Sequence, residues 1–214
     1  MLASSRLIAA LLSLAQLFVM PLKAETREEW IKLGERVHGG FGSFIPVGIR
    51  IGLDALQRLD AKPRELTVTF YTGARSPCPC FADGIMIATS ASPGQGTLEV
   101  AREKAPPGVL ALVIIKHRKS GSTLKYTVSE SWLPKLGAWN RTLDPAGRYD
   151  EVMKAEGLLK WCHDPSAPII VHARPGRRTV CCAQTIVGPP AKAGEYPATA
   201  GQVRALRHSA MANT

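Results

Sequence analysis

The chain has 214 residues, of which 45% are hydrophobic, and a formal net charge of +10 at pH 7. This length can bury a sizeable core as one domain, and after the first residues there is no apolar run long enough to span a bilayer. The basic residues are scattered without interleaved aromatic residues, so we expect no nucleic acid as a partner.

Residues 1–24 have the layout of a secretory signal peptide. Arg6 gives a positive start, residues 7–19 are uncharged, and a small residue, Ala24, ends the segment. We therefore expect an exported protein, periplasmic or secreted, with a bacterial source suspected and with no stable membrane anchor after cleavage. Cleavage would remove Arg6 and Lys23 and no acid, which lowers the formal charge from +10 to +8.

Two helices are predicted after this segment. Thr26 is a candidate N-cap for a helix that closes at His38, with Trp30, Leu33 and Val37 at helical spacing. Glycines at 39, 40 and 42 interrupt the pattern. Pro46 suits the first position of a second helix, which we expect to carry apolar residues on one face (Ile49, Leu53, Leu56, Leu59), charged residues on another (Arg50, Asp54, Arg58), and a close-packing pair of glycines at 48 and 52.

The rest of the chain predicts strands with one buried helix among them. Residues 66–71 alternate β-formers, and residues 81–89 favour a buried helix, although periodicity alone does not exclude a strand there. Further strands are predicted at 97–101, 109–117 and 123–129, the last two as a hairpin. We expect residues 132–147 to be irregular, 149–161 to be helical, 168–173 and 179–186 to form a second hairpin, and 188–214 to be a disordered tail.

The concentrated chemistry of the chain lies in Ser76-Pro-Cys78-Pro-Cys80-Phe-Ala-Asp83, at the junction of a predicted strand and a predicted helix. Thiolates are ligands for transition metals, and a helix start lowers the pKa of a thiol. A disulfide between Cys78 and Cys80 is not expected, because it would close a very small ring through Pro79. Asp83 suits the acid that complements a helix N-terminus better than a catalytic base.

Four landmarks in this order resemble the E-type family of formylmethanofuran dehydrogenase subunits. They are His38-Gly39, the segment from Pro46 to Leu53, Cys80-Phe-Ala-Asp83-Gly-Ile85 and Gly94-Gln-Gly96-Thr-Leu98. The resemblance runs from about Trp30 to Ala173 and assigns residues 25–187 to one domain. It implies an α+β fold of helix, strand and helix followed by an antiparallel or mixed sheet of about four to six strands, similar to the C-terminal domain of glyceraldehyde-3-phosphate dehydrogenase.

The resemblance also implies a transition-metal ion, zinc-like, held by His38 and Cys80, with Cys78 as an additional thiol. Some family positions are changed here: Gly40 stands where the family commonly has a second histidine, and Ala91 and Gln95 replace a cysteine and a lysine. His38 is therefore balanced between a metal ligand and a helix-end histidine bonded to carbonyls. The cysteine-rich tail of the family is also missing.

Two classes of function remain open at this point. In the first, the chain is an exported metal-binding protein with a binding or accessory role, whose partners are a metal ion or small ligand and whose assembly includes a homodimer as an option. In the second it is a thiol-dependent or redox enzyme, with Cys80 as nucleophile and His38 as base. A scaffold with a vestigial site is the third interpretation, so the sequence leaves open whether the chain is an enzyme.

Five cysteines are an odd number for an oxidising compartment. Cys162, Cys181 and Cys182 lie outside the landmarks. Since neighbouring strand residues face opposite ways, at most one of Cys181 and Cys182 could pair with Cys162. The remaining histidines, His117, His163 and His172, are expected at the surface or in packing roles.

Overall fold

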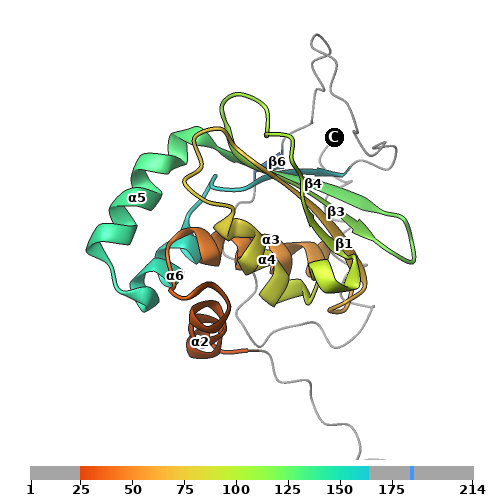
Figure 1. The fold of residues 1–214 in the computed structure, drawn as a ribbon, viewed down its shortest axis with the longest axis horizontal. Helices are drawn as coiled ribbons and strands as arrows, with labels where there is room; N and C mark the ends of the chain where they lie inside the picture. The colour runs from red at the N-terminus through yellow and green to blue at the C-terminus, as the bar shows by residue number, and fades with distance from the viewer. Residues whose placement is uncertain (1–24, 164–183, 186–214) are drawn as a thin grey trace, which may run out of the picture. The chain divides into compact units, whose positions relative to one another are not determined.

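The computed structural model describes residues 25–163 and 184–185, and the following account is confined to them. Helices and strands alternate along the first half, and strands dominate the middle (Figure 1). The elements are α2 Arg27–His38, α3 Phe44–Arg58, β1 Leu66–Thr72, α4 Cys80–Thr89, the 3₁₀ turn η1 Pro93–Gln95, β2 Leu98–Val100, β3 Val109–His117, β4 Thr123–Ser129, the 3₁₀ turn η2 Glu130–Trp132, α5 Leu133–Thr142, α6 Pro145–Lys154, β5 Lys160–His163 and β6 Gln184–Thr185.

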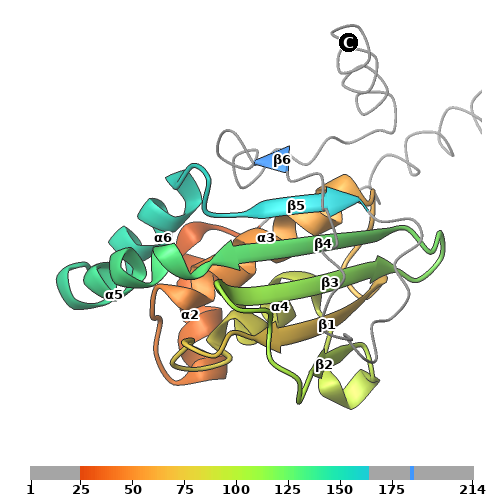
Figure 2. The same ribbon diagram turned by 90° about the horizontal axis from the view of Figure 1, so that it is seen from above.

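The strands form one mixed sheet in the order β2-β1-β3-β4-β5-β6 (Figure 2). Only β1 and β2 are parallel, and every other neighbouring pair is antiparallel. Alternate residues of β1, including Val68 and Phe70, are buried and pair with Ile115 and Val113 of β3, so one face of the sheet carries the core. The expected α+β class and the mixed sheet are confirmed.

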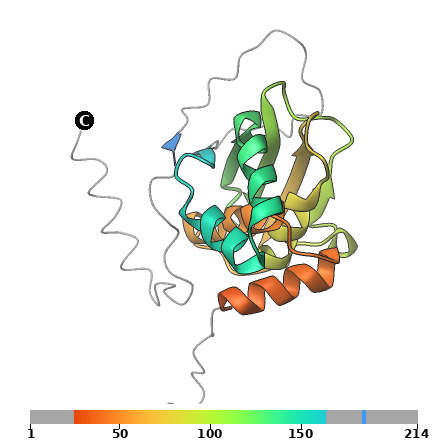
Figure 3. The same ribbon diagram turned by 90° about the vertical axis from the view of Figure 1, so that its left-hand side faces the viewer.

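All of the main helices lie on that apolar side of the sheet. Figure 1 shows α3 and α4 directly under the strands, with α2 farther from them, and Figure 3 shows α2 running across the outside of this helical layer. The core therefore sits between the sheet and α3 and α4, where Ile45, Phe70 and Phe81 are fully buried.

Helix α2 begins as its sequence predicts. The Thr26 side chain accepts a hydrogen bond from the Glu29 amide, and Glu29 accepts one from the Thr26 amide, which makes a capping box. At the other end Gly39 takes a left-handed conformation with φ of 85° and caps the helix through the Glu35 carbonyl. His38, the last helical residue, is thereby held where the chain turns.

Helix α3 begins at Phe44, two residues before the expected start at Pro46. Proline is tolerated at this third position, since the first four amides of a helix have no intrahelical partner. Its charged face also differs from that of a surface helix, because Arg50 and Asp54 are both buried. Asp54 accepts hydrogen bonds from Tyr126 at 2.7 Å and from Arg58 at 2.6 Å, and these three residues are called the buried polar network below.

Arg50 connects α3 to the end of α6. Its Nη1 donates to the carbonyls of Val152 and Ala155, at 2.7 Å each, and the side chain is 1% exposed. Burial lowers the pKa of the Arg50 guanidinium, and the nearby charge of Asp54 opposes this shift. The last carbonyls of α6 thus receive the donors that a helix end needs from a residue about a hundred positions earlier in the chain.

The segment after β4 corrects two expectations. Residues 132–147, expected to be irregular, contain α5 and the start of α6; Pro134 stands in the first turn of α5, where it is tolerated, and only Leu136 and Trp139 are buried, so the helical pattern is weak. Residues 149–161 were expected to be one helix, but α6 ends at Lys154 and Gly157 takes a φ of 70°. Trp161 then pairs with Tyr126 in the sheet.

Other expectations fare as follows. The strands at 66–71, 109–117 and 123–129, the hairpin between the last two, and the helix at 81–89 are confirmed. The second hairpin and the tail lie outside the described residues, except that β6 pairs antiparallel with β5. Within the described part of the chain, no helix combines the length and apolar character needed to cross a membrane.

Candidate functional site

The position of α4 is fixed by a backbone contact with α3. A Cβ atom on Gly48 would lie 2.1 Å from the Phe81 carbonyl oxygen, and one on Gly84 would lie 2.1 Å from the Ile45 carbonyl oxygen. Only glycines allow two helices to approach this closely. The close-packing role expected for Gly48 is confirmed, and the contact anchors the first turns of α4, where Cys80 and Asp83 lie.

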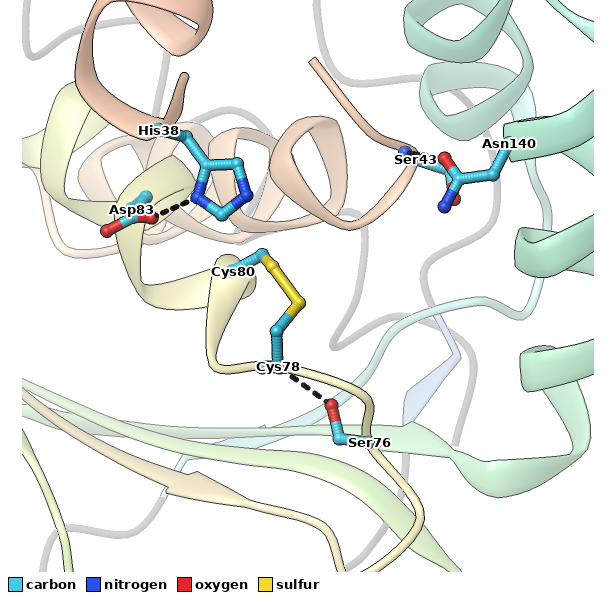
Figure 4. Close-up of a disulfide and its surroundings, with 7 residues drawn as sticks. All are labelled: His38, Ser43, Ser76, Cys78, Cys80, Asp83 and Asn140. Carbon is cyan, nitrogen blue, oxygen red and sulfur yellow. Dashed lines mark hydrogen bonds and ion pairs between the residues drawn. A yellow bond between two sulfur atoms is a disulfide. The ribbon is translucent and has the colours of Figure 1, made fainter. Parts of the chain in front are cut away.

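His38 reaches this end of α4 from α2. Its Nδ1 lies 2.7 Å from Oδ2 of Asp83, and the two side chains are 33% and 35% exposed (Figure 4). Because an ionised carboxylate can only accept, Nδ1 is the donor in this pair. In the neutral ring Nε2 then carries the lone pair and is left open for another partner.

Cys78 and Cys80 are joined by a disulfide, with their Cα atoms 5.4 Å apart (Figure 4). The expectation that these two residues would not pair is therefore wrong. Pro79, with φ of −80° and ψ of 24°, turns the chain so that the Cα separation falls in the usual range for disulfides. Cys80 is 7% exposed, whereas Cys78 is half-buried, and the Ser76 hydroxyl donates to the Cys78 carbonyl at 2.9 Å.

This disulfide can add little to the stability of the fold. Closing a loop of three residues removes only about 1.6 kcal/mol of chain entropy from the unfolded state, against about 3 kcal/mol for a 15-residue loop. The α3–α4 contact that positions the site does not depend on it. The bond between Cys78 and Cys80 is therefore better explained by chemistry at the site than by a structural need.

The disulfide and the His38–Asp83 pair belong to the same end of α4. Cys80 and Asp83 are three residues apart on the helix, so they occupy the same face. Among the residues that the structure describes, no group of three His, Cys, Asp or Glu side chains is arranged to hold a metal ion. With both sulfurs in a disulfide, the expected ligands are close together but lack their thiolates.

Ser43 and Asn140 border the site and were missed by the sequence reasoning. The Ser43 amide donates to Oδ1 of Asn140 at 2.6 Å, and its hydroxyl donates to the Leu136 carbonyl at 2.7 Å. Figure 4 shows this pair beyond the disulfide as seen from His38. No pattern in the sequence connects α5 with the start of α3, so only the fold could bring Asn140 here.

The other candidate residues lie elsewhere. Cys162 is on β5, opposite Lys125 of β4, and its expected partners Cys181 and Cys182 lie outside the described residues. His117 is buried and contacts the Ser120 hydroxyl at 2.9 Å, while His163 is exposed at the end of β5. His172 lies outside the described residues.

A sequence model of one protein family matches the chain over residues 37–163. The family is described as "FmdE, Molybdenum formylmethanofuran dehydrogenase operon". The match begins one residue before His38 and ends with the last residue of β5, so it contains the whole candidate site. No curated protein matches the chain.

Proposed function

The chain belongs to the FmdE family, and from that premise we propose that it is an exported accessory protein that binds a zinc-like transition-metal ion. The ligands proposed are His38, Cys80 and Cys78, the two cysteines in their reduced state. Membership of the family supports an accessory, metal-related role. The identity of the ion and the three ligands are the proposal.

The observation that carries this proposal is the bond between Nδ1 of His38 and Asp83. Metal-binding histidines almost always donate their other ring nitrogen to a carboxylate, a backbone carbonyl or water, which fixes the tautomer and orients the ring. A histidine held this way presents Nε2 with a free lone pair. Asp83 therefore acts here as the carboxylate that prepares a ligand.

The residue types fit a zinc-like ion only when the disulfide is open. Cysteine binds such a metal as the thiolate, and two thiolates with one imidazole match a common donor set for zinc. The first turn of α4 has no side-chain cap, so its amides favour a negatively charged Cys80 sulfur. With three protein ligands, a bound ion would keep one position for water or a small ligand and act there as a Lewis acid.

Metal titration of the reduced chain tests the proposal. We expect one Co²⁺ or Zn²⁺ per chain by elemental analysis, with the thiolate-to-cobalt absorption band of cysteine ligation. His38→Ala and Cys80→Ser should abolish this stoichiometric binding, and Asp83→Asn should weaken it by about 10–100-fold. His163→Ala, which changes an exposed histidine away from the site, is the matched control. Reduced protein that binds no metal, or variants that bind like the wild type, would contradict the proposal.

Three further expectations remain proposals. Export would be supported by an N-terminal sequence beginning at Glu25 in protein isolated from culture medium or periplasm. A homodimer would be supported by the mass of the protein in solution. Similarity of the α+β fold to the C-terminal domain of glyceraldehyde-3-phosphate dehydrogenase would be supported by superposition of the sheet and of α3 and α4.

A further inference from the structure

We propose that Cys78–Cys80 is a thiol–disulfide exchange centre that accepts two electrons from a substrate carrying two cysteine thiols. Cys78 is the sulfur that the incoming thiolate attacks, and Cys80 is the sulfur that leaves. This activity goes beyond metal binding and does not rest on it, because the metal proposal concerns the reduced chain and this one concerns the oxidised chain.

The exposure of the two sulfur-bearing residues sets the direction of attack. Cys78 is half-buried in a turn between two exposed prolines, Pro77 and Pro79, whereas Cys80 is 7% exposed and packs with the core. The Ser76 hydroxyl holds the turn through the Cys78 carbonyl. An incoming thiolate therefore meets Cys78 first.

Helix α4 makes Cys80 the better leaving group. Cys80 is the first residue of a ten-residue helix whose N-terminus has no side-chain cap, so unpaired amides face the developing thiolate. Asp83 in the same turn would oppose this negative charge, but its carboxylate is bonded to His38. The His38 ring stands at the same end of α4 and supplies a hydrogen-bond donor near the departing sulfur when it is protonated.

The exchange balances in two steps. A substrate thiolate attacks Sγ of Cys78, the bond between the two cysteines breaks, and the electron pair leaves with Cys80 as a thiolate. The second substrate thiolate then attacks the substrate sulfur of the mixed disulfide, and Cys78 leaves as a thiolate. The substrate dithiol becomes a disulfide, the Cys78–Cys80 pair becomes a dithiol, and the two substrate protons pass to His38 and solvent.

The fold tolerates the opening of this bond. Only Pro79 separates the two cysteines, and the start of α4 is held against α3 by the glycine contact rather than by the disulfide. A bond that closes so short a loop constrains the unfolded chain weakly. The site can therefore cycle between oxidised and reduced forms without unfolding the domain.

Equilibration with redox buffers tests the proposal. The oxidised full chain, with a chelator present, is incubated with mixtures of reduced and oxidised glutathione or with a reduced two-cysteine peptide, then quenched with acid and mapped by alkylation and mass spectrometry. We expect a reversible two-electron couple that follows the square of the glutathione concentration divided by that of its disulfide. The peptide arm should give one peptide disulfide for each Cys78–Cys80 bond lost.

Variants identify the roles of the two sulfurs. With glutathione disulfide, Cys80→Ser should accumulate glutathione on Cys78, and Cys78→Ser should label Cys80 at least tenfold more slowly. His38→Ala should slow exchange of the wild-type disulfide about tenfold or more, while His163→Ala should leave the rate unchanged.

Three results would overturn the proposal. They are thiols at Cys78 and Cys80 that stay reduced in excess glutathione disulfide, a disulfide that opens only when the chain unfolds, or equal labelling of the two cysteines. Because a chelator is present throughout, a chain that exchanges disulfides yet binds no metal when reduced would refute only the function proposed above. The opposite pattern would refute only the exchange activity.

Discussion

Adding one methyl group at Gly84 should separate α4 from α3. The new Cβ would lie 2.1 Å from the Ile45 carbonyl oxygen and 2.8 Å from the Ile49 amide nitrogen, far inside the 3.4–4 Å of ordinary contact. Both obstacles are backbone atoms of a buried helix, so neither can move like a flexible side chain. Helix propensity favours alanine over glycine by about 1 kcal/mol, whereas overpacking costs about 1–3 kcal/mol, and we take the upper end here.

The net loss for Gly84→Ala is therefore about 2 kcal/mol, which corresponds to a Tm lower by about 4–8 °C for a domain of this size. The matched control is Gly137→Ala in α5, where the nearest atom to the new Cβ is a flexible Arg141 nitrogen at 3.5 Å. There only propensity acts, and we expect Tm to rise by about 2–4 °C. Thermal unfolding followed by circular dichroism measures both. A Gly84→Ala protein as stable as the wild type would refute the backbone contact as the anchor of α4.

Three other predictions follow from the geometry. Tyr126→Phe removes a donor from the buried polar network and should cost about 1–3 kcal/mol in urea unfolding; an unchanged midpoint would contradict the bond. Hydrogen bonds led by that from Lys119 lower the pKa of Glu65 to about 2 from 4.5, so its stabilising contribution is full above pH 4.5 and lost as pH falls towards 2. Glu65→Gln should therefore flatten the decline of Tm over that interval, and parallel curves would disprove it. Replacing Cys78 and Cys80 together by serine should lower stability by about 1.6 kcal/mol or less in equilibrium unfolding, and a much larger loss would make the disulfide a structural staple.

The sequence was sufficient for the central elements of the fold because their patterns are local. The alternation of β1 and the Thr26–Glu29 capping box each depend on residues within a few positions of one another. The segment that forms α5 lacked such a pattern, since a two-residue apolar face is too small to predict a helix. Trp161 looked helical because it follows α6 in period, and only its pairing with Tyr126 places it in the sheet.

The site was predictable in part. His38, Cys80 and Asp83 were singled out from their positions at helix ends, which are local features. The ion pair between His38 and Asp83 spans 45 positions and depends on α2 crossing α4, so no spacing rule could give it. The pairing of Cys78 with Cys80 was excluded because a small ring was taken as a barrier, whereas the turn at Pro79 already brings the two Cα atoms to 5.4 Å.

Arg50 determines where the chain could be shortened. Its guanidinium is buried in α3 and depends on two carbonyl oxygens at 152 and 155, which lie near the far end of the matched family region. A chain cut before these positions would keep the charge and lose its acceptors, at a cost of about 3–5 kcal/mol, comparable to the whole stability of many small domains. Fragments for expression, or fusions at the carboxyl side, should therefore retain the polypeptide at least through Ala155.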